Sequence, residues 1–154
     1  MSESPDTAPG GAHDLHVTAA QRLRGDSQRY TSNRRALVAL LDASDHPVTI
    51  AEVLTLRTDL AQSSVYRNLA ILEQAGVVNR VVATDEFTRF ELAQDLTEHH
   101  HHLICTACGA VADFTVEPYL EASMDEAFRL VGRQTGFETE HHRLDLVGRC
   151  ATCA

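Results

Sequence analysis

Two Cys-x-x-Cys pairs place the strongest constraint on how this chain folds. Cys105 and Cys108 lie in the second half of the chain, and Cys150 and Cys153 repeat the spacing at its end, after a gap of 41 residues. Two intervening residues let both thiolates of a pair reach one tetrahedral ion, and two pairs complete four coordination positions. We therefore predict a closed, structural zinc site that ties a strand to the end of the chain.

A redox dithiol is the alternative interpretation of a Cys-x-x-Cys pair. A thioredoxin-like motif needs the pair at the start of a helix in a βαβ unit. Here the first pair follows "HLIC", which is typical of a strand, and precedes Gly109, which permits the tight backbone of a zinc knuckle. The local sequence therefore favours zinc over redox chemistry.

Four consecutive histidines, residues 99–102, lead into the first cysteine pair. Side chains alternate along an extended strand, so His99 and His101 should point to one side and His100 and His102 to the other. Each side then offers two imidazoles to one ion. The sequence predicts two different metal half-sites on opposite faces of a single strand.

Each half-site needs further ligands from elsewhere in the chain. The candidates are Glu91 and His46 for the pair formed by His100 and His102, and Glu121 and His142 for the pair formed by His99 and His101. Mixed imidazole and carboxylate ligation suits Zn(II), Fe(II), Mn(II) or Co(II), and does not choose among them.

The first half of the chain predicts four helices and a hairpin. Apolar spacing predicts helices in "LHVTAAQRL", in "YTSNRRALVALLDAS" with a Thr31 or Ser32 cap, and in "DHPVTIAEVLTL" with a Thr49 cap. "QSSVYRNLAILEQAGVV" predicts a fourth helix, capped by Ser63 and ended by Gly76. "VVNRVVA" and "FTRFEL", joined at "TDE", predict a hairpin. This order of elements is typical of a winged-helix DNA-binding domain.

The fourth helix has one apolar and one polar face. Val65, Leu69 and Leu72 recur at helical spacing and should face the core. The opposite face is small, aromatic and cationic near its N-terminal end, which suits entry into a major groove. The candidates for contacting DNA on this helix are Ser63, Ser64, Tyr66 and Arg67.

Charge is distributed unevenly along the chain. The net charge is −9, yet residues 15–80 carry a net charge of +2 and residues 81–154 a net charge of −8. This asymmetry is expected if only the first half meets phosphates. The chain has neither a signal peptide nor an apolar run long enough for a membrane span, so we expect a cytoplasmic protein.

The second half predicts a small α/β unit. "VADF" and "HRLDLVG" are strand candidates, and a helix should begin near Pro118 and end at Gly136. A unit of this size has a thin core, which metal binding and self-association would both reinforce. We expect an α+β chain of three parts: a disordered tail (1–13), a winged-helix DNA-binding domain (14–93) and a metal-binding dimerisation domain (94–154).

These motifs together resemble the ferric uptake regulator family of bacterial metal-dependent repressors. The similarity rests on "VYRNLAILEQAGVV", "FEL", "HHHHLICTACG" and the terminal "CATC", and runs from about Thr31 to Cys153. The resemblance implies that the four cysteines hold structural Zn(II). It implies a regulatory metal site of Glu91, His100 and His102 at the hinge, near His46, and a further site of His99, His101, Glu121 and His142. It also implies a DNA-binding role for Arg34, within Thr31-x-x-Arg34.

The function implied is that of a homodimeric repressor of metal-homeostasis genes, which binds palindromic operator DNA with Fe(II) or Zn(II) as co-repressor. A peroxide-sensing repressor of the same family is one alternative, although such proteins typically carry an aspartate where this chain has Glu91. A zinc-stabilised DNA-binding module that senses nothing is another. A zinc hydrolase is disfavoured, because the chain lacks a His-Glu-x-x-His motif, and we expect no catalytic residues.

Overall fold

The computed structural model describes residues 11–154, with side chains described from residue 14. Most of the predicted disordered tail therefore lies outside the described residues, and the first helix already begins at Gly11. The elements in chain order are α1 (Gly11–Gly25), α2 (Ser32–Asp42), β1 (Val48–Thr49), α3 (Ile50–Leu56), α4 (Gln62–Gln74), β2 (Val78–Val82), β3 (Thr88–Leu92), a 3₁₀ turn (Gln94–Leu96), β4 (His101–Cys105), β5 (Val111–Phe114), α5 (Pro118–Thr135) and β6 (Asp145–Gly148).

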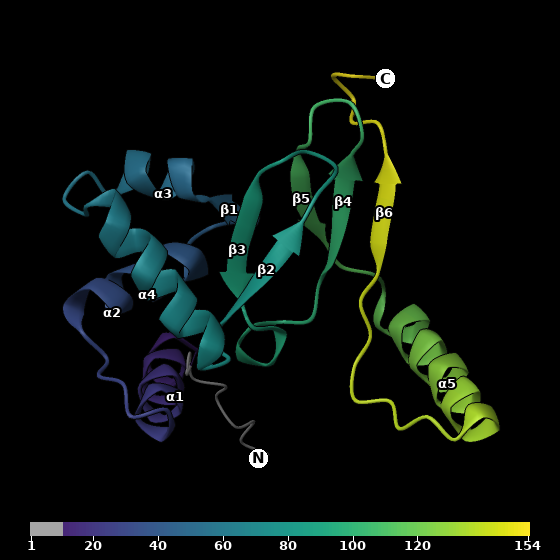
Figure 1. Cartoon of the computed structure of the whole chain (residues 1–154). Helices are drawn as coiled ribbons and strands as arrows, with labels where there is room; N and C mark the ends of the chain where they lie inside the picture. Colours follow the sequence, from purple (N-terminus) through teal and green to yellow (C-terminus); the bar gives the residue numbers. More distant parts are fainter. Residues whose placement is uncertain (1–10) are drawn as a thin grey trace, which may run out of the picture.

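The first half is a winged helix, as the sequence predicted. Helices α1 to α4 pack beside an antiparallel sheet of order β1-β3-β2, and the β2–β3 hairpin is the wing (Figure 1). Thr31 caps α2, and Thr49 and Glu52 form a capping box on α3, so two of the predicted caps are confirmed. The main hydrophobic core draws all its fully buried members from residues 15–92.

Helix α4 differs from its prediction at one end only. Val65, Leu69 and Leu72 are buried in the core, and Gly76 follows the helix with φ +70°, as expected for a left-handed terminating residue. The predicted Ser63 cap is wrong, because the helix begins at Gln62 and Ala61 is the capping residue, without a side-chain hydrogen bond. Ser63 is instead exposed in the first helical turn.

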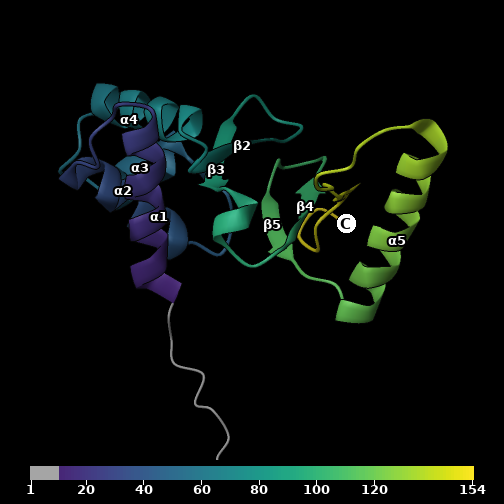
Figure 2. The ribbon, with the colours of Figure 1, turned by 90° about the horizontal axis from the view of Figure 1, so that it is seen from below.

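The second half is a three-stranded sheet of order β5-β4-β6, with α5 in the crossover between β5 and β6. Strand β4 is central, antiparallel to β5 and parallel to β6. Pro118 begins α5 and Gly136 ends it at φ +71°, which confirms the predicted limits of this helix. Figures 1 and 2 show the resulting layers: helices α1 to α4, the wing sheet, the second sheet, and α5 on the far side.

The two halves of the chain differ in how many apolar side chains they bury. Outside the main core, the described residues contain a small cluster formed by Val81 of the wing with Ile104 and Val111 of the second sheet. All four residues of β6 are exposed. Among the described residues, no helix has the length and apolar character needed to cross a membrane.

Candidate metal centres and DNA-binding surface

The four cysteines meet at one point, which we call the cysteine group. Cys105 ends β4, Cys108 follows in the tight turn to β5, and Cys150 and Cys153 lie beyond β6. Their sulfur atoms all lie within 4.8 Å of one another, and the Cys108 and Cys150 sulfurs are 3.8 Å apart. Tetrahedral zinc with Zn–S bonds of about 2.3 Å separates its sulfurs by about 3.8 Å. The spacing fits four thiolates on one ion and not a disulfide.

The backbone around Cys105 favours its thiolate. The Cys150 N–H donates to Cys105 Sγ over 3.3 Å, and this and other backbone N–H groups lower the pKa of Cys105 to about 6. A thiol must lose its proton to bind a metal. The local backbone therefore favours the metal-binding form of Cys105.

The predicted alternation of the four histidines is present in the structure. His100 and His102 point to the side of β4 that meets the wing, and the nearest carboxylate is Glu91 of β3. Its Oε2 atom lies 3.1 Å from His100 Nε2 and 2.8 Å from His102 Nε2. Asp113 of β5 completes the set, which we call the hinge group, and its four ligand atoms lie within 4.8 Å of one another.

Outer hydrogen bonds orient both imidazoles of the hinge group. His100 Nδ1 lies 3.0 Å from the Glu98 carbonyl, and His102 Nδ1 lies 3.2 Å from Asp145 Oδ1. With a proton on Nδ1 in each ring, a bound metal ion would take the Nε2 lone pairs in place of the present hydrogen bonds from Nε2 to Glu91.

Charge pairing overcomes burial within the hinge group. Burial opposes the charged form of both partners, yet the Glu91 carboxylate raises the pKa of His102 above its usual value, and the two histidines lower the pKa of Glu91. Burial raises the pKa of Asp113. A divalent cation would satisfy these four inward-facing donors together.

Asp113 was missed in the sequence, although its strand was predicted. The register of β4 and β5 pairs His102 with Asp113 directly, and the register of β4 and β6 pairs His102 with Asp145. Directly paired residues share one face of a sheet. The signal was available, because the tight turn after Cys105 fixes how the two strands align.

His46, the predicted fourth ligand, lies outside the hinge group. Its ring contacts Asp45 and Glu52, at 2.7 and 3.2 Å, and the Asp45 hydrogen bond is the main cause of its raised pKa. A cavity of about 670 Å³ separates it from the group and is lined by His46, Glu91, His100 and Asp113, among others.

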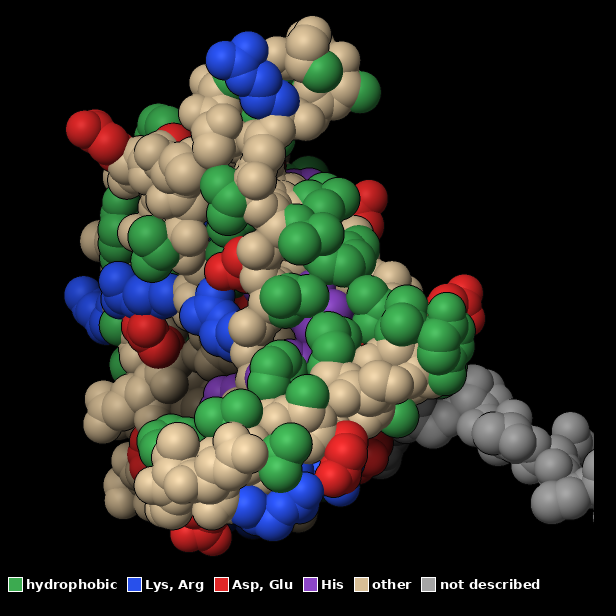
Figure 3. Space-filling view, turned by 90° about the vertical axis from the view of Figure 1, so that its right-hand side faces the viewer, with side chains coloured by type: hydrophobic (Ala, Val, Ile, Leu, Met, Phe, Trp, Pro, Cys, Tyr) green, Lys and Arg blue, Asp and Glu red, His purple; other side chains and the backbone are tan. Residues whose placement is uncertain are grey.

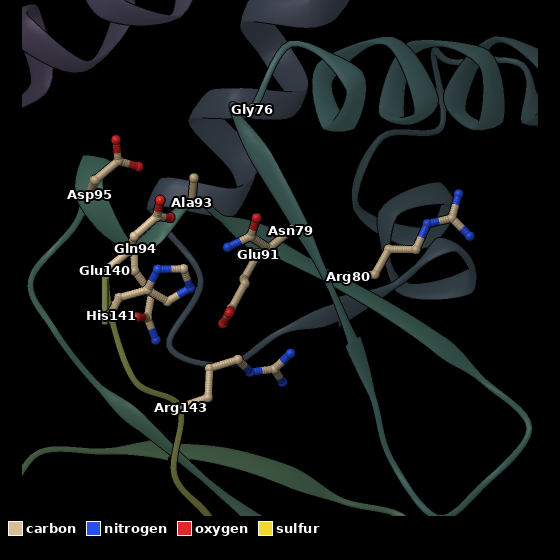
Figure 4. A pocket seen from close by; sticks show the side chains of 10 residues that line it. All are labelled: Gly76, Asn79, Arg80, Glu91, Ala93, Gln94, Asp95, Glu140, His141 and Arg143. Atoms are coloured by element: carbon tan, nitrogen blue, oxygen red, sulfur yellow. The ribbon is translucent and has the colours of Figure 1, made fainter. Parts of the chain in front are cut away.

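A second cavity reaches Glu91 from the other side. It has a volume of about 460 Å³ and lies between the end of α4 and residues 140–143. In Figure 4, Glu91 and Asn79 lie on one side of this space, and His141 and Arg143 lie on the other side. The hinge group is therefore approached by solvent from two directions.

The histidines on the opposite side of β4 form the third set, which we call the α5 group. It consists of His99, His101, Glu121 and His142, whose ligand atoms also lie within 4.8 Å of one another. Glu121 of α5 is central, because its Oε1 lies 3.0 Å from His99 Nε2 and 2.8 Å from His142 Nε2, and its Oε2 lies 2.9 Å from His101 Nε2. The sequence predicted these four residues together.

Within the α5 group, His101 Nε2 and Glu121 Oε2 have hydrogen-bond geometry, whereas the close contacts of Glu121 Oε1 do not. His142 Nε2 and Glu121 Oε1 are buried and 2.8 Å apart, yet neither has a hydrogen-bond partner among the described residues. Neighbouring ligands at 90° on an octahedral ion with bonds of about 2.1 Å are separated by about 3.0 Å. Donor atoms that converge on a point between them, rather than on each other, fit a shared metal ion.

The exposed face of α4 is the candidate DNA-binding surface. Ser63, Tyr66 and Arg67 are exposed, with 54% of Tyr66 accessible, and Ser64 is half-buried beside them. These four predicted residues thus share one surface at the N-terminal end of the helix. None of the described ion pairs engages Arg67, which leaves its guanidinium available to a phosphate or base edge.

Arg34 occupies a different position from the one expected of a direct DNA contact. It is 8% exposed, its Nε donates to Asn68 Oδ1 over 3.0 Å, and its guanidinium also donates to the Arg29 carbonyl. Asn68 in turn donates to the Ser64 carbonyl. Arg34 therefore holds the start of α4, the candidate recognition helix, against α2.

Fold and site together define a winged-helix protein with three grouped sets of metal-binding side chains. The model of the ferric uptake regulator family matches residues 26–147, and the chain belongs to this family. It is 31% identical to the peroxide operon regulator of Bacillus subtilis, over 93% of this chain and 95% of that protein. It is 29% identical to the peroxide-responsive repressor PerR of Staphylococcus aureus, over 92% of each.

Solved structures support the same assignment. The ferric uptake regulator Fur of Helicobacter pylori superposes with a TM-score of 0.70 at 22% identity, over 92% of each chain, and shows that the fold is shared. The ferric uptake regulator of Pseudomonas aeruginosa with manganese superposes with a TM-score of 0.68 at 25% identity, over 85% of this chain and 96% of that one.

Proposed function

We propose that this protein is a metal-responsive transcriptional repressor that binds operator DNA as a homodimer. The observation that supports this most directly is the composition of the hinge group. Glu91 belongs to the wing sheet, whereas His102 and Asp113 belong to the second sheet and His100 directly precedes β4. An ion held by all four donors ties the winged helix to the second half of the chain.

In this proposal, metal binding by the hinge group sets the relative orientation of the two halves of the chain. The four donors meet only when the two halves hold one relative position, so an ion favours that position by its differential affinity. Couplings of this kind typically change the affinity at a second site by about 5- to 150-fold. His46 lies across the neighbouring cavity and is positioned to add a ligand if that cavity narrows.

The proposed homodimer uses the outer face of the second half. Figure 3 shows hydrophobic side chains gathered over α5 and β6. Tyr119 and Phe137 are 68% and 71% exposed, and Val147 of β6 is 60% exposed. Burying such a patch against a second copy would add the apolar contact that the thin second half lacks. Separate domains at 14–93 and 94–154 fit this arrangement, since the buried members of the main core end at Leu92.

A direct test measures operator binding as a function of metal. Chelator-treated protein that retains its cysteine-bound zinc is titrated with Fe(II), Zn(II), Mn(II) and Ni(II) at matched free concentrations. We expect at least one of these ions to restore operator binding, and the His100→Ala/His102→Ala variant to lose that response. His141→Ala is the matched control, because His141 is exposed and belongs to none of the three groups.

Two outcomes separate this proposal from its alternatives. Metal-independent operator binding that the His100→Ala/His102→Ala change leaves intact would identify a zinc-stabilised DNA-binding module. A metal-dependent hydrolytic turnover lost in the same variant would instead indicate an enzyme. We propose that the protein has no enzymatic activity and acts in the cytoplasm, as a regulator of metal-homeostasis genes.

A peroxide-sensing role is the second candidate function, because the two curated relatives described above are peroxide-responsive repressors. The test compares protein loaded with Fe(II) and protein loaded with Mn(II) after exposure to hydrogen peroxide. Irreversible loss of operator binding in the Fe(II) form alone, with oxidation of His100 or His102 seen by mass spectrometry, would favour peroxide sensing. Equal resistance of both forms would favour metal sensing.

A further inference from the structure

The turn of the wing lies against the turn that carries the first cysteine pair. We call residues 83–87 the wing tip and residues 105–109 the knuckle. Thr84 Oγ1 donates a hydrogen bond to the Cys105 carbonyl over 3.2 Å. A Cβ atom at Gly109, which has φ +72°, would lie 2.7 Å from Cγ and 2.9 Å from Cβ of Asp85. Such distances mean that the Asp85 side chain fills the space that only glycine leaves free.

An apolar contact lies beneath these two turns. Val81 of β2 is fully buried against Ile104 of β4 and Val111 of β5, which are 6% and 8% exposed, and Ala83 packs against the same cluster. A wing that reached into solvent would leave Val81 exposed. Burial of this cluster therefore stabilises the contact between the wing and the second sheet.

The charges of the wing tip do not suit a nucleic-acid contact. Arg89 is the single basic residue between positions 81 and 92, and the same stretch contains Asp85, Glu86 and Glu91. Arg89 is 8% exposed and binds both carboxylate oxygens of Asp85 at 2.7 Å. The electrostatic part of DNA affinity comes from unpaired Lys and Arg side chains, which the described wing tip lacks.

We propose that the wing of this protein is an interdomain strut, whose tip docks on the knuckle and fixes the angle of the recognition helix. The partner of the wing tip is then the Cys105–Gly109 turn of its own chain rather than DNA. The effect on operator binding rests on the proposed function, whereas the docking itself does not.

Two separated contacts explain how the angle is fixed. The hinge group joins the halves near the start of β4, at His102, and the strut joins them at its end, at Cys105. At about 3.3 Å per residue, these points lie about 10 Å apart along the strand. One contact permits rotation about itself in every direction, and the second restricts that rotation. Figure 1 shows the wing tip and the knuckle at the same end of the two sheets.

The test measures the distance between the two halves without DNA. Nitroxides are attached through a ketone-bearing residue placed at Arg24 of α1 and Arg129 of α5, which leaves all four cysteines intact. Labelled protein is diluted with unlabelled protein, and pulsed electron resonance gives the distance distribution. We expect Ala83→Glu, which puts a charge into the apolar cluster, to shift or broaden this distribution and to lower operator affinity about tenfold.

Glycine variants provide a matched pair for the same contact. Gly109→Ala combines left-handed backbone strain with overlap against Asp85, whereas Gly136→Ala has the same strain at φ +71° with nothing within 4 Å. We expect only Gly109→Ala to shift the distribution, and Asp85→Ala in that background to restore it. Zinc content is measured in each variant, and Ala83→Glu tests the strut away from the cysteines if Gly109→Ala loses zinc.

A substitution at Glu86 distinguishes a strut from a wing that contacts DNA, because the Glu86 side chain is exposed at the wing tip. If the wings of the proposed homodimer lay on DNA, Glu86→Lys would add one phosphate contact in each protomer and steepen the dependence of log affinity on log salt by about 1.8. We expect no change in that slope. A steeper slope, or a distance distribution that neither Ala83→Glu nor Gly109→Ala alters, would overturn the strut. If the protein bound no operator although its distance distribution responded to the variants as expected, the result would count against the proposed repressor and not against the strut.

Discussion

The hinge group and the α5 group use the same histidine run and differ in what they connect. His100 and His102 face a carboxylate from the wing sheet, whereas His99 and His101 face Glu121 and His142, which belong to the same half of the chain as β4. An ion in the hinge group therefore constrains how two halves are oriented. An ion in the α5 group can only reinforce one of them. In the proposed function, alternation along one strand separates a regulatory site from a stabilising site.

The largest effect on operator affinity should come from Glu91→Ala. This change removes the one hinge-group donor that the wing sheet supplies, so metal bound to the remaining donors no longer favours one orientation. We expect operator affinity at saturating metal to fall by about 100-fold, towards the metal-free value. Fluorescence anisotropy with a labelled operator measures this. An affinity that still responded fully to metal would show that Glu91 does not carry the coupling.

A smaller effect should follow from Asp145→Asn, which alters the hydrogen bond that orients His102 without removing a ligand. Partners of this kind typically change metal affinity by about 10- to 100-fold. We expect the metal concentration needed for half-maximal operator binding to rise about tenfold, while the affinity at saturating metal stays unchanged. Asp125→Asn is the matched control, since Asp125 contacts His142 of the α5 group through the corresponding ring nitrogen. A rise of the same size in both variants would contradict the distinction between the groups.

Local periodicity accounts for what the sequence predicted well. The capping residues Thr31 and Thr49, the terminating residues Gly76 and Gly136, and the division of the histidines into two faces each depend on a few neighbouring positions. The predicted Ser63 cap was wrong because α4 begins at Gln62 without a side-chain cap. The residue types around Ser63 do not indicate this.

Long-range features were harder to predict, because they depend on register and docking. Asp113 joins the hinge group through its pairing opposite His102, a register that the tight turn after Cys105 indicates once both strands are placed. His46 was predicted to be a ligand of the hinge group, yet a cavity separates its side chain from that group. The contact of Asp85 with Gly109 joins two turns whose meeting depends on how the halves pack. No local pattern in the chain encodes that arrangement.

The smallest effect on operator affinity should come from Glu121→Ala, and its main effect should be on stability. Glu121 contacts all three histidines of the α5 group, so its removal should abolish metal binding there. At a metal concentration of about 100 times Kd, that loss corresponds to about 2.7 kcal/mol of unfolding free energy. For a chain of this size, the melting temperature should fall by about 5–10 °C, while operator affinity at saturating metal changes less than about fivefold. Calorimetry and anisotropy on the same preparation measure both quantities. A large loss of operator affinity with an unchanged melting temperature would reverse the roles assigned to the two faces of β4.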